Sequence, residues 1–164
     1  MSHNIINNLP VIKAVPSKSL IGKHLTMCFA NNTTFKLWSS FMPVRHNILN
    51  AVSTDLYSVQ VYPDGFFEDF DANAEFAKWA AVEVSNLDDI TAGMESFILP
   101  AGLYAVFGYK GKPEDGAETF KYILQEWLPQ SGYTLDNRPH FEVLGAKYKN
   151  GDMESEEEIW IPIK

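Results

Sequence analysis

Cysteine is almost missing from the sequence, since Cys28 is the single example among 164 residues. One thiol cannot build an internal disulfide framework, and this scarcity is typical of the reducing cytoplasm. No stretch approaches the roughly eighteen consecutive apolar residues of a membrane-spanning helix. The first residues also lack the basic cluster of a secretory signal. We therefore expect a cytoplasmic protein without a membrane partner.

Positive charge is also scarce. The 13 Lys and Arg residues are outnumbered by 21 Asp and Glu residues, which gives a formal net charge of −8. Because phosphate backbones require a basic surface, we expect no direct contact with nucleic acid. Hydrophobic residues make up 46% of the chain and aromatic residues 13%. This composition supplies a core and argues against disorder.

The usual signatures of cofactor, metal and nucleophilic chemistry are absent. The sequence has no complete phosphate-binding loop, no dinucleotide-binding glycine fingerprint, and no cysteines or histidines at metal-ligand spacing. It also lacks a Gly-x-Ser-x-Gly elbow. Cys28 stands between Met27 and Phe29 and is typical of a small core residue. The sequence therefore predicts no metal site and no cofactor.

Two segments, residues 33–42 and 117–128, carry apolar residues at helical spacing, and a proline follows each of them. Five positions match at a constant offset of 86: Leu37/Ile123, Trp38/Leu124, Phe41/Trp127, Met42/Leu128 and Pro43/Pro129. The match indicates an internal duplication. The alternative is that any two amphipathic helices ending at proline look alike.

Strand-like runs flank both helices in the same order. They cover residues 20–29, 56–62 and 76–84 around the first helix, and 97–109, 140–146 and 158–163 around the second. We predict an α+β fold with a duplicated strand–helix–strand–strand module, in which an antiparallel sheet carries two main helices. The single domain, residues 1–164, would contain modules at about 9–85 and 95–164. The cleft between related halves is a natural ligand pocket.

Glu142 lies inside a run that otherwise suits a strand with both faces covered. Period two places His140, Glu142 and Leu144 on one face, and Phe141 and Val143 on the other. A carboxylate buried there costs several kcal/mol, roughly, unless it is paired. The alternatives are that this face is open to water, or that a basic neighbour pairs with the carboxylate. The available neighbours are Arg138, His140 and Lys147.

Glu158 is a second candidate for a carboxylate in the cleft. It follows the acidic residues Glu154, Glu156 and Glu157, which favours a solvated run. On period two it shares a face with Trp160, whereas the neighbouring isoleucines form the face suited to packing on helices. Whether Glu142 or Glu158 faces the cleft stays open.

Large aromatic residues lie on the elements expected to form the core or the cleft walls. They are Trp38, Phe41, Trp79, Tyr104, Trp127 and Trp160. A carboxylate among aromatic rings binds an apolar cation, because the rings supply dispersion and cation–π attraction. The alternative for each ring is ordinary core, which suits Trp38 and Trp127 on their helices.

Four segments in this order resemble the GyrI-like small-molecule-binding domain, the effector-binding domain of AraC-type and MerR-type multidrug-responsive regulators. They are residues 99–107 (LPAGLYAVF), 127–133 (WLPQSGY), 138–142 (RPHFE) and 158–163 (EIWIPI). The resemblance implies two modules related by a pseudo-twofold axis. It also implies that a glutamate of the next-to-last strand contacts cationic hydrophobic drugs, and Glu142 matches that position.

The same resemblance implies a wider site around Glu142. Leu144 would share its wall, and Tyr104 and Trp127 match the family's pocket aromatics. Some members are enzymes that hydrolyse cyclopropanoid compounds with a pocket glutamate and a tyrosine. In such an enzyme, Glu142 would be the base and Tyr104 would polarise the substrate.

We expect a stand-alone module without a DNA-binding domain that captures amphipathic, cationic or aromatic small molecules. The expected ligand-binding residues are Glu142, Tyr104, Trp127, Trp38, Phe41, Leu144 and Trp160. One alternative is the cyclopropanoid hydrolase described above. The other is a protein-binding inhibitor of the gyrase-inhibitor type, although nothing in the sequence points to a partner surface.

Overall fold

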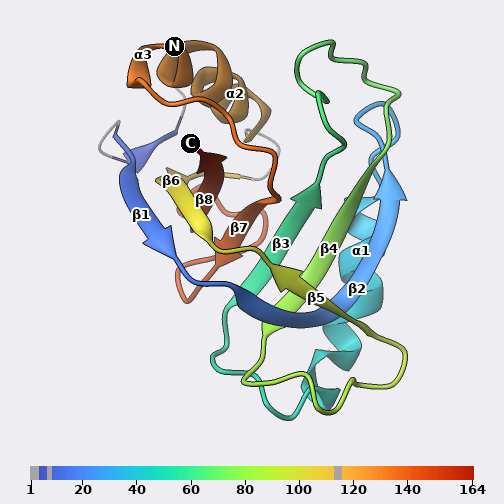
Figure 1. The fold of residues 1–164 in the computed structure, drawn as a ribbon. Helices are drawn as coiled ribbons and strands as arrows, with labels where there is room; N and C mark the ends of the chain where they lie inside the picture. The colour runs from blue at the N-terminus through green and yellow to red at the C-terminus, as the bar shows by residue number, and fades with distance from the viewer. Residues whose placement is uncertain (1–3, 7–8, 113–115) are drawn as a thin grey trace.

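The computed structural model describes residues 4–6, 9–112 and 116–164. Its strands are β1 (Val11–Val15), β2 (Lys18–Met27), β3 (Leu56–Val61), β4 (Phe76–Glu83), β5 (Glu95–Leu99), β6 (Gly102–Lys110), β7 (His140–Leu144) and β8 (Glu156–Ile163). Its helical segments are α1 (Thr34–Phe41), the 3₁₀ segment η2 (Met42–Asn47), α2 (Gly116–Tyr122), the π-helical turn η4 (Ile123–Trp127) and α3 (Leu128–Ser131). Figure 1 shows their arrangement.

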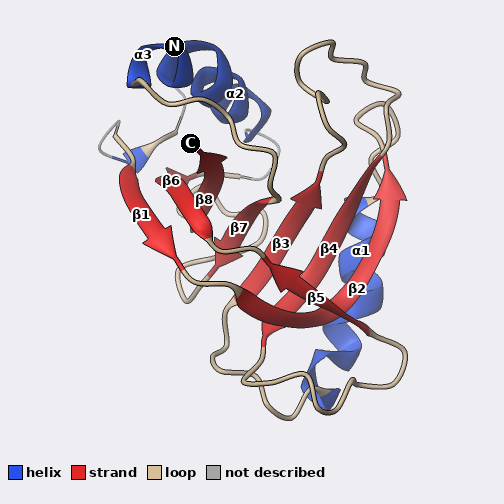
Figure 2. Ribbon diagram, in the orientation of Figure 1, coloured by secondary structure: helices blue, strands red, loops and turns tan. Residues whose placement is uncertain are grey.

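The eight strands form one antiparallel sheet in the order β1-β6-β8-β7-β3-β4-β2-β5. Each half of the chain supplies two strands, a helix and two further strands, and β3 and β7 meet at the centre (Figure 2). The predicted α+β fold with a duplicated module is therefore confirmed. The first strand of each half joins the other half, because β1 pairs with β6 and β5 pairs with β2.

Both helices pack on the same face of the sheet, which we call the helix face. Leu37 and Phe41 of α1 are buried against residues of β2, β3 and β4. Ile123 is buried in the same way against β6 and β8. Leu37 and Ile123, which the sequence aligned, are both fully buried. Each half thus has its own helix–sheet core.

Both helical regions continue through their prolines, contrary to the expectation that they end there. Pro43 lies in the first turn of η2, and Pro129 lies in the first turn of α3. Proline is tolerated in a first turn, where its missing N–H has no helical partner to lose. In the second half, the π-helical turn Ile123–Trp127 comes directly before α3.

Five of the six predicted strand runs each match one strand, namely β2, β3, β4, β7 and β8, and the predictions differ from the structure at two places. β1 was missed because its residues are mostly exposed and lack alternation. Residues 97–109 form parts of two strands, β5 and β6, with Pro100 between them. Proline cannot donate to the sheet ladder, so a continuous strand was the wrong interpretation of that run.

The opposite face of the sheet carries a core of its own, which we call the aromatic face. It includes Tyr57, Trp79, Tyr104, Phe141 and Trp160. The sheet is curved (Figure 1). The strands also approach closely at Gly22, where an added Cβ atom would lie 2.0 Å from the carbonyl oxygen of Ala80. Within the described residues, no helix is long and apolar enough to span a membrane.

Candidate functional site

A polar strip crosses the middle of the helix face, on β3 and β7, between the cores of the two helices. Ser58 stands opposite Glu142, and Gln60 stands opposite His140. Ser58, Gln60 and His140 are all buried, with exposures of 4–7%. The adjacent pair Leu56 and Leu144 belongs to the α1 core. Four polar side chains therefore lie together where the two halves of the molecule join.

Glu142 is largely buried, and its Oε2 atom has no hydrogen-bond partner among the described residues. Burial raises the pKa of Glu142 above its ordinary value, while the charge of Lys78 and a hydrogen bond from the Gln60 side chain oppose that rise. A buried acceptor without a donor is costly. The strip therefore contains a carboxyl group suited to an external donor.

The basic neighbours that could have paired with Glu142 are engaged elsewhere. The Nε atom of Arg138 donates to Asp136 at 2.7 Å, and Lys147 lies 3.9 Å from Glu156. Both faces of β7 are covered, which decides between the alternatives that the sequence left open. Neither a solvated face nor one of these two residues satisfies the carboxylate.

His140 is the second unsatisfied group, because its buried Nδ1 atom has no partner among the described residues. Burial lowers the pKa of His140 to about 3, so the ring is neutral at physiological pH. It contacts three aromatic rings, those of Tyr62, Phe67 and Phe120, at centroid distances of 5.0, 5.7 and 5.8 Å. His140 therefore links the polar strip to an aromatic wall.

These three rings form what we call the aromatic cap. Tyr62 and Phe67 lie on the connection between β3 and β4, and Phe120 lies on α2. Phe67 contacts Tyr62 at 4.8 Å and Phe120 at 5.6 Å, so the cap joins the two halves of the molecule. The charge of Glu142 contributes to raising the pKa of Tyr62, after burial as the main cause. The cap therefore lies close to the carboxyl group.

Two surface hollows lie away from Glu142. One, of about 360 Å³, is lined by Leu9 and by helical residues that include Trp127. The other, of about 210 Å³, lies beside α1 and is lined by residues that include His24 and Glu95. Neither is lined by Glu142 or His140. The strip itself is covered, since Ser58, Gln60 and His140 are buried, so a molecule reaching it would have to displace part of the covering side chains.

Two of the expected site residues, Tyr104 and Trp160, lie on the aromatic face and are not brought to Glu142. The strand register explains this, because Glu142 stands opposite Ile159 whereas Phe141 stands opposite Trp160. The pairing of β6 with β8 places Tyr104 on the same side as Trp160. Tyr104 and Glu142 are thus on opposite faces of the sheet and cannot act on one substrate atom.

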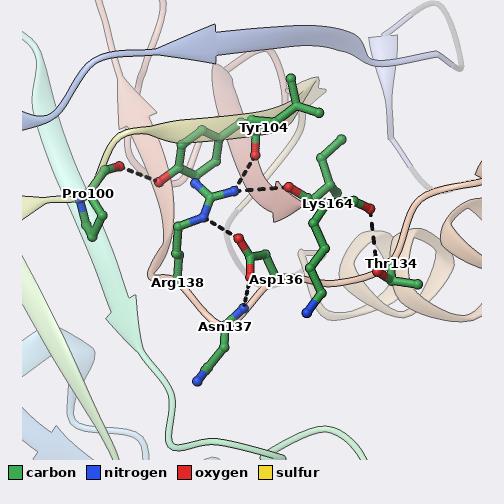
Figure 3. Close-up of polar contacts among 9 residues, drawn as sticks. Pro100, Tyr104, Thr134, Asp136, Asn137, Arg138 and Lys164 are labelled. Atoms are coloured by element: carbon green, nitrogen blue, oxygen red, sulfur yellow. Dashed lines mark hydrogen bonds and ion pairs between the residues drawn. The ribbon is translucent and has the colours of Figure 1, made fainter.

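Tyr104 has a structural environment of its own (Figure 3). Its hydroxyl group donates to the carbonyl oxygen of Pro100 at 3.2 Å, and the guanidinium of Arg138 lies 4.5 Å from its ring centroid. Arg138 Nη2 also donates to the carbonyl oxygens of Leu103, at 2.6 Å, and Ile163, at 3.1 Å. This cluster joins β6, β8 and the segment that enters β7.

The remaining expected residues lie on the helix face. Phe41 is fully buried in the α1 core, and Trp38 is half-buried with its ring edge-on to Phe41 at 6.0 Å. Trp127 packs edge-on against Phe107 at 5.0 Å in the other helix core. Leu144 lies two residues from Glu142 on the same strand face. Trp38, Phe41 and Leu144 thus belong to the α1 core, and Trp127 belongs to the core of the other helix.

Glu158 is exposed on the aromatic face, where it accepts a hydrogen bond from Trp160 Nε1 at 3.2 Å. Its neighbour Glu157 lies on the helix face and is half-buried. Burial and the charge of Glu142 raise the pKa of Glu157 to about 8, while Lys78 opposes the rise. Glu142 and Glu157 thus project from the helix face, whereas Glu158 projects from the aromatic face.

Several residues of the polar strip, the aromatic cap and their surroundings were not predicted as site residues from the sequence. They are Ser58, Gln60, Tyr62, Phe67, Lys78, Phe120 and Glu157. A signal for Glu157 existed, since period two places it on the face of Ile159, Ile161 and Ile163. Within the described residues, no group of three or more His, Cys, Asp or Glu side chains could hold a metal ion.

The model for the family described as "GyrI-like small molecule binding domain" matches residues 10–164. The transcriptional regulator BrlR of Pseudomonas aeruginosa is 27% identical over 150 residues, which are 90% of this chain and 53% of that protein. The chain thus spans about half the length of this curated relative.

Two solved structures share the fold. SAV2435 bound to tetraphenylphosphonium has a TM-score of 0.65 and 18% sequence identity, over 94% of this chain and 93% of that chain. The C-terminal domain of EcmrR has a TM-score of 0.69 and 14% identity, over 94% of this chain and 96% of that chain. At such identities, the likeness shows the common fold.

Proposed function

The chain belongs to the family of GyrI-like small molecule binding domains, and from that premise we propose that it binds organic cations bearing apolar or aromatic groups, with Glu142 as the counter-charge. The observation that carries this proposal is the buried Oε2 atom of Glu142, which has no partner among the described residues. A positive ligand would compensate a carboxylate that burial otherwise disfavours.

The aromatic cap supports the apolar part of the proposal. Tyr62, Phe67 and Phe120 surround His140, two residues from Glu142 on the same strand face. If the cap swings aside, its rings can contact the body of a bound cation, which adds dispersion and cation–π attraction to the charge pairing. Phe67 can move with the connecting loop that carries it.

A hydrolase built on Glu142 and Tyr104 is not supported. The two side chains lie on opposite faces of the sheet, and the Tyr104 hydroxyl group is bonded to Pro100. A general acid and a general base must both reach the reacting atoms. For the inhibitor alternative, no feature of the described residues identifies a protein partner.

Isothermal titration with tetraphenylphosphonium, the cation in the SAV2435 structure, tests the proposal. The comparison uses the wild type, Glu142→Gln, and the matched control Glu158→Gln, which alters an exposed carboxylate on the other face. We expect binding by the wild type and the control, and affinity at least about tenfold lower in Glu142→Gln, since pairing with a buried charge is worth more than 1.4 kcal/mol. Equal affinity for all three proteins would contradict the role of Glu142.

A further inference from the structure

Glu157 stands diagonally across from Glu142 on the neighbouring strand. Glu142 is opposite Ile159, and Glu157 precedes Ile159 by two residues, so all three project from the helix face. Diagonal neighbours on adjacent antiparallel strands lie roughly 7–8 Å apart, within reach of long side chains. The two carboxyl groups can therefore converge on one small ligand.

The groups facing this pair come from four strands or their ends. Lys78 projects from β4, Gln60 from β3, Tyr62 from the end of β3, and His140 from β7. On β6, Tyr109 stands opposite Glu157, and the Tyr109 hydroxyl group donates to the carbonyl oxygen of Lys112. Lys78 is the single basic side chain acting on both carboxyl groups among the described residues.

The charges in this cluster do not balance when both glutamates are ionised. Two carboxylates and one ammonium give a net charge of −1, and His140 is neutral. Within the described part of the chain, none of the ion pairs involves Glu142, Glu157 or Lys78. Because the pKa of Glu157 is raised to about 8, the free site retains a proton at neutral pH. One cation could replace that proton.

We propose that Glu157 is the second carboxylate of the site, and that the preferred ligands are protonated amines, amidines or guanidines whose N–H groups bridge Glu142 and Glu157. This inference rests on the proposed function. Glu142 Oε2 and His140 Nδ1 are buried polar atoms without partners, and an N–H donor satisfies the carboxylate oxygen whereas a quaternary cation does not. Hydrogen bonds between charged groups are also the stronger ones.

The test uses two cations with the same body, 1-naphthylmethylamine and its N,N,N-trimethyl derivative. Both carry one positive charge near neutral pH, and only the first has N–H donors. Isothermal titration at pH 6, 7 and 8, in buffers of different ionisation enthalpy, measures affinity and counts released protons. The proteins are the wild type, Glu157→Gln and the matched control Glu156→Gln, whose side chain projects from the other face of β8.

We expect the wild type to bind the amine at least about tenfold more tightly than the trimethyl derivative, and to release a proton on binding at pH 7. Affinity for the amine should rise by about tenfold or more from pH 6 to pH 8, since the ionised form of Glu157 becomes more populated. Glu157→Gln should lose this rise and the proton release while still binding cations, and Glu156→Gln should behave as the wild type does.

Equal affinity for the two cations, or an unchanged pH profile in Glu157→Gln, would overturn this inference and leave the proposed function intact. If neither naphthyl cation nor tetraphenylphosphonium bound the wild type, the proposed function and the inference would both fail. Melting curves of the variants verify that each protein is folded at the pH of the titration.

Discussion

Neighbouring residues of β7 lie in opposite environments, with Phe141 on the aromatic face and Glu142 on the helix face. Phe141 stacks on Trp160 at 5.0 Å and contacts Tyr104 at 5.3 Å. On that face the rings already have cationic neighbours, since Lys13 lies 5.5 Å from the ring centroid of Trp160 and Arg138 lies 4.5 Å from that of Tyr104.

The helix face differs in the kind of buried atom that lacks a partner among the described residues: a carboxyl oxygen and an imidazole nitrogen there, against the N–H donor Arg138 Nη1 on the aromatic face. Glu142 Oε2 and His140 Nδ1 are buried there and make no hydrogen bond to the described residues. A concentration of aromatic residues therefore does not by itself locate a ligand site. Rings that pack against one another and against an internal cation form a core. A buried carboxyl oxygen without a hydrogen-bond donor, in contrast, is a place where a ligand can donate.

The largest expected effect is the loss of stability in Phe141→Ala. Phe141 is 1% exposed, and its removal leaves a cavity among Tyr57, Tyr104 and Trp160. The free energy of unfolding should fall by about 3–5 kcal/mol, as measured by urea denaturation. Phe35→Ala is the matched control, because Phe35 is 85% exposed. A similar small loss in both variants would mean that the aromatic face is not a packed core.

Arg138→Met tests the polar cluster at the edge of the aromatic face. The substitution removes the ion pair with Asp136 and the hydrogen bonds to two backbone carbonyl groups. We expect a loss of about 1.5–3 kcal/mol, typical of hydrogen bonds to a charged group. Arg45→Met, in η2, should change stability by less than about 0.5 kcal/mol. Equal values for the two arginines would show that the cluster contributes nothing specific.

Phe67→Ala opens the aromatic cap on the helix face. It removes contacts with Tyr62, Phe120 and His140, and the expected loss is about 1 kcal/mol because ring pairs contribute about 0.5–1.5 kcal/mol. Stopped-flow mixing with tetraphenylphosphonium should show faster association than in the wild type. An unchanged association rate, with the affinity retained, would mean that ligands enter by another route.

The smallest expected effect is the pH dependence of stability, because Glu157 is half-exposed and water screens its charge. Its folded-state pKa of about 8 exceeds the ordinary value of 4.5. The folded protein therefore retains a proton that the unfolded chain has lost, and stability declines as the pH rises towards 8. Below pH 6.5 the lowered pKa of His140 acts in the other direction, since stability then increases with pH.

The effect of Glu157 on stability is therefore best measured between pH 6.5 and pH 8, where His140 does not oppose it. There we expect the melting temperature of the ligand-free wild type to fall, and the fall to be smaller in Glu157→Gln. A residual slope is expected because the pKa of Glu142 is raised too. Glu156→Gln provides the comparison. A slope identical in all three proteins would indicate that Glu157 is fully solvated in the folded state.

Periodicity predicted five strands and the two helices because it depends on each segment alone, but it missed β1 and joined β5 to β6. It correctly divided His140–Leu144 into two faces and placed Glu142 with Leu144. It could not place Tyr104 relative to Glu142, because that depends on the register of β6 on β8 and of β8 on β7. A shift of one residue in either register exchanges the faces.

The sequence also could not predict which charged residues are buried. Glu157 stands in an acidic run that is typical of solvated loops. Its actual environment comes from the continuation of β8 beside β6, where it stands opposite Tyr109. The cap was equally hidden, since the contact of Phe67 with Phe120 joins residues from different halves of the chain. Contacts of this kind follow from tertiary packing, not from local pattern.

The exchange of first strands between the halves also governs how the chain can fold. Val11 pairs with Val106, so β1 waits for a partner synthesised ninety-five residues later, whereas β2 can pair with β4 before β5 is made. Such distant pairings slow folding because the chain must close long loops before it gains the contacts. A nascent chain lacking its second half would present β1 as an unpaired edge, open to pairing with other chains. Folding of this sheet is therefore completed only after most of the chain has emerged from the ribosome.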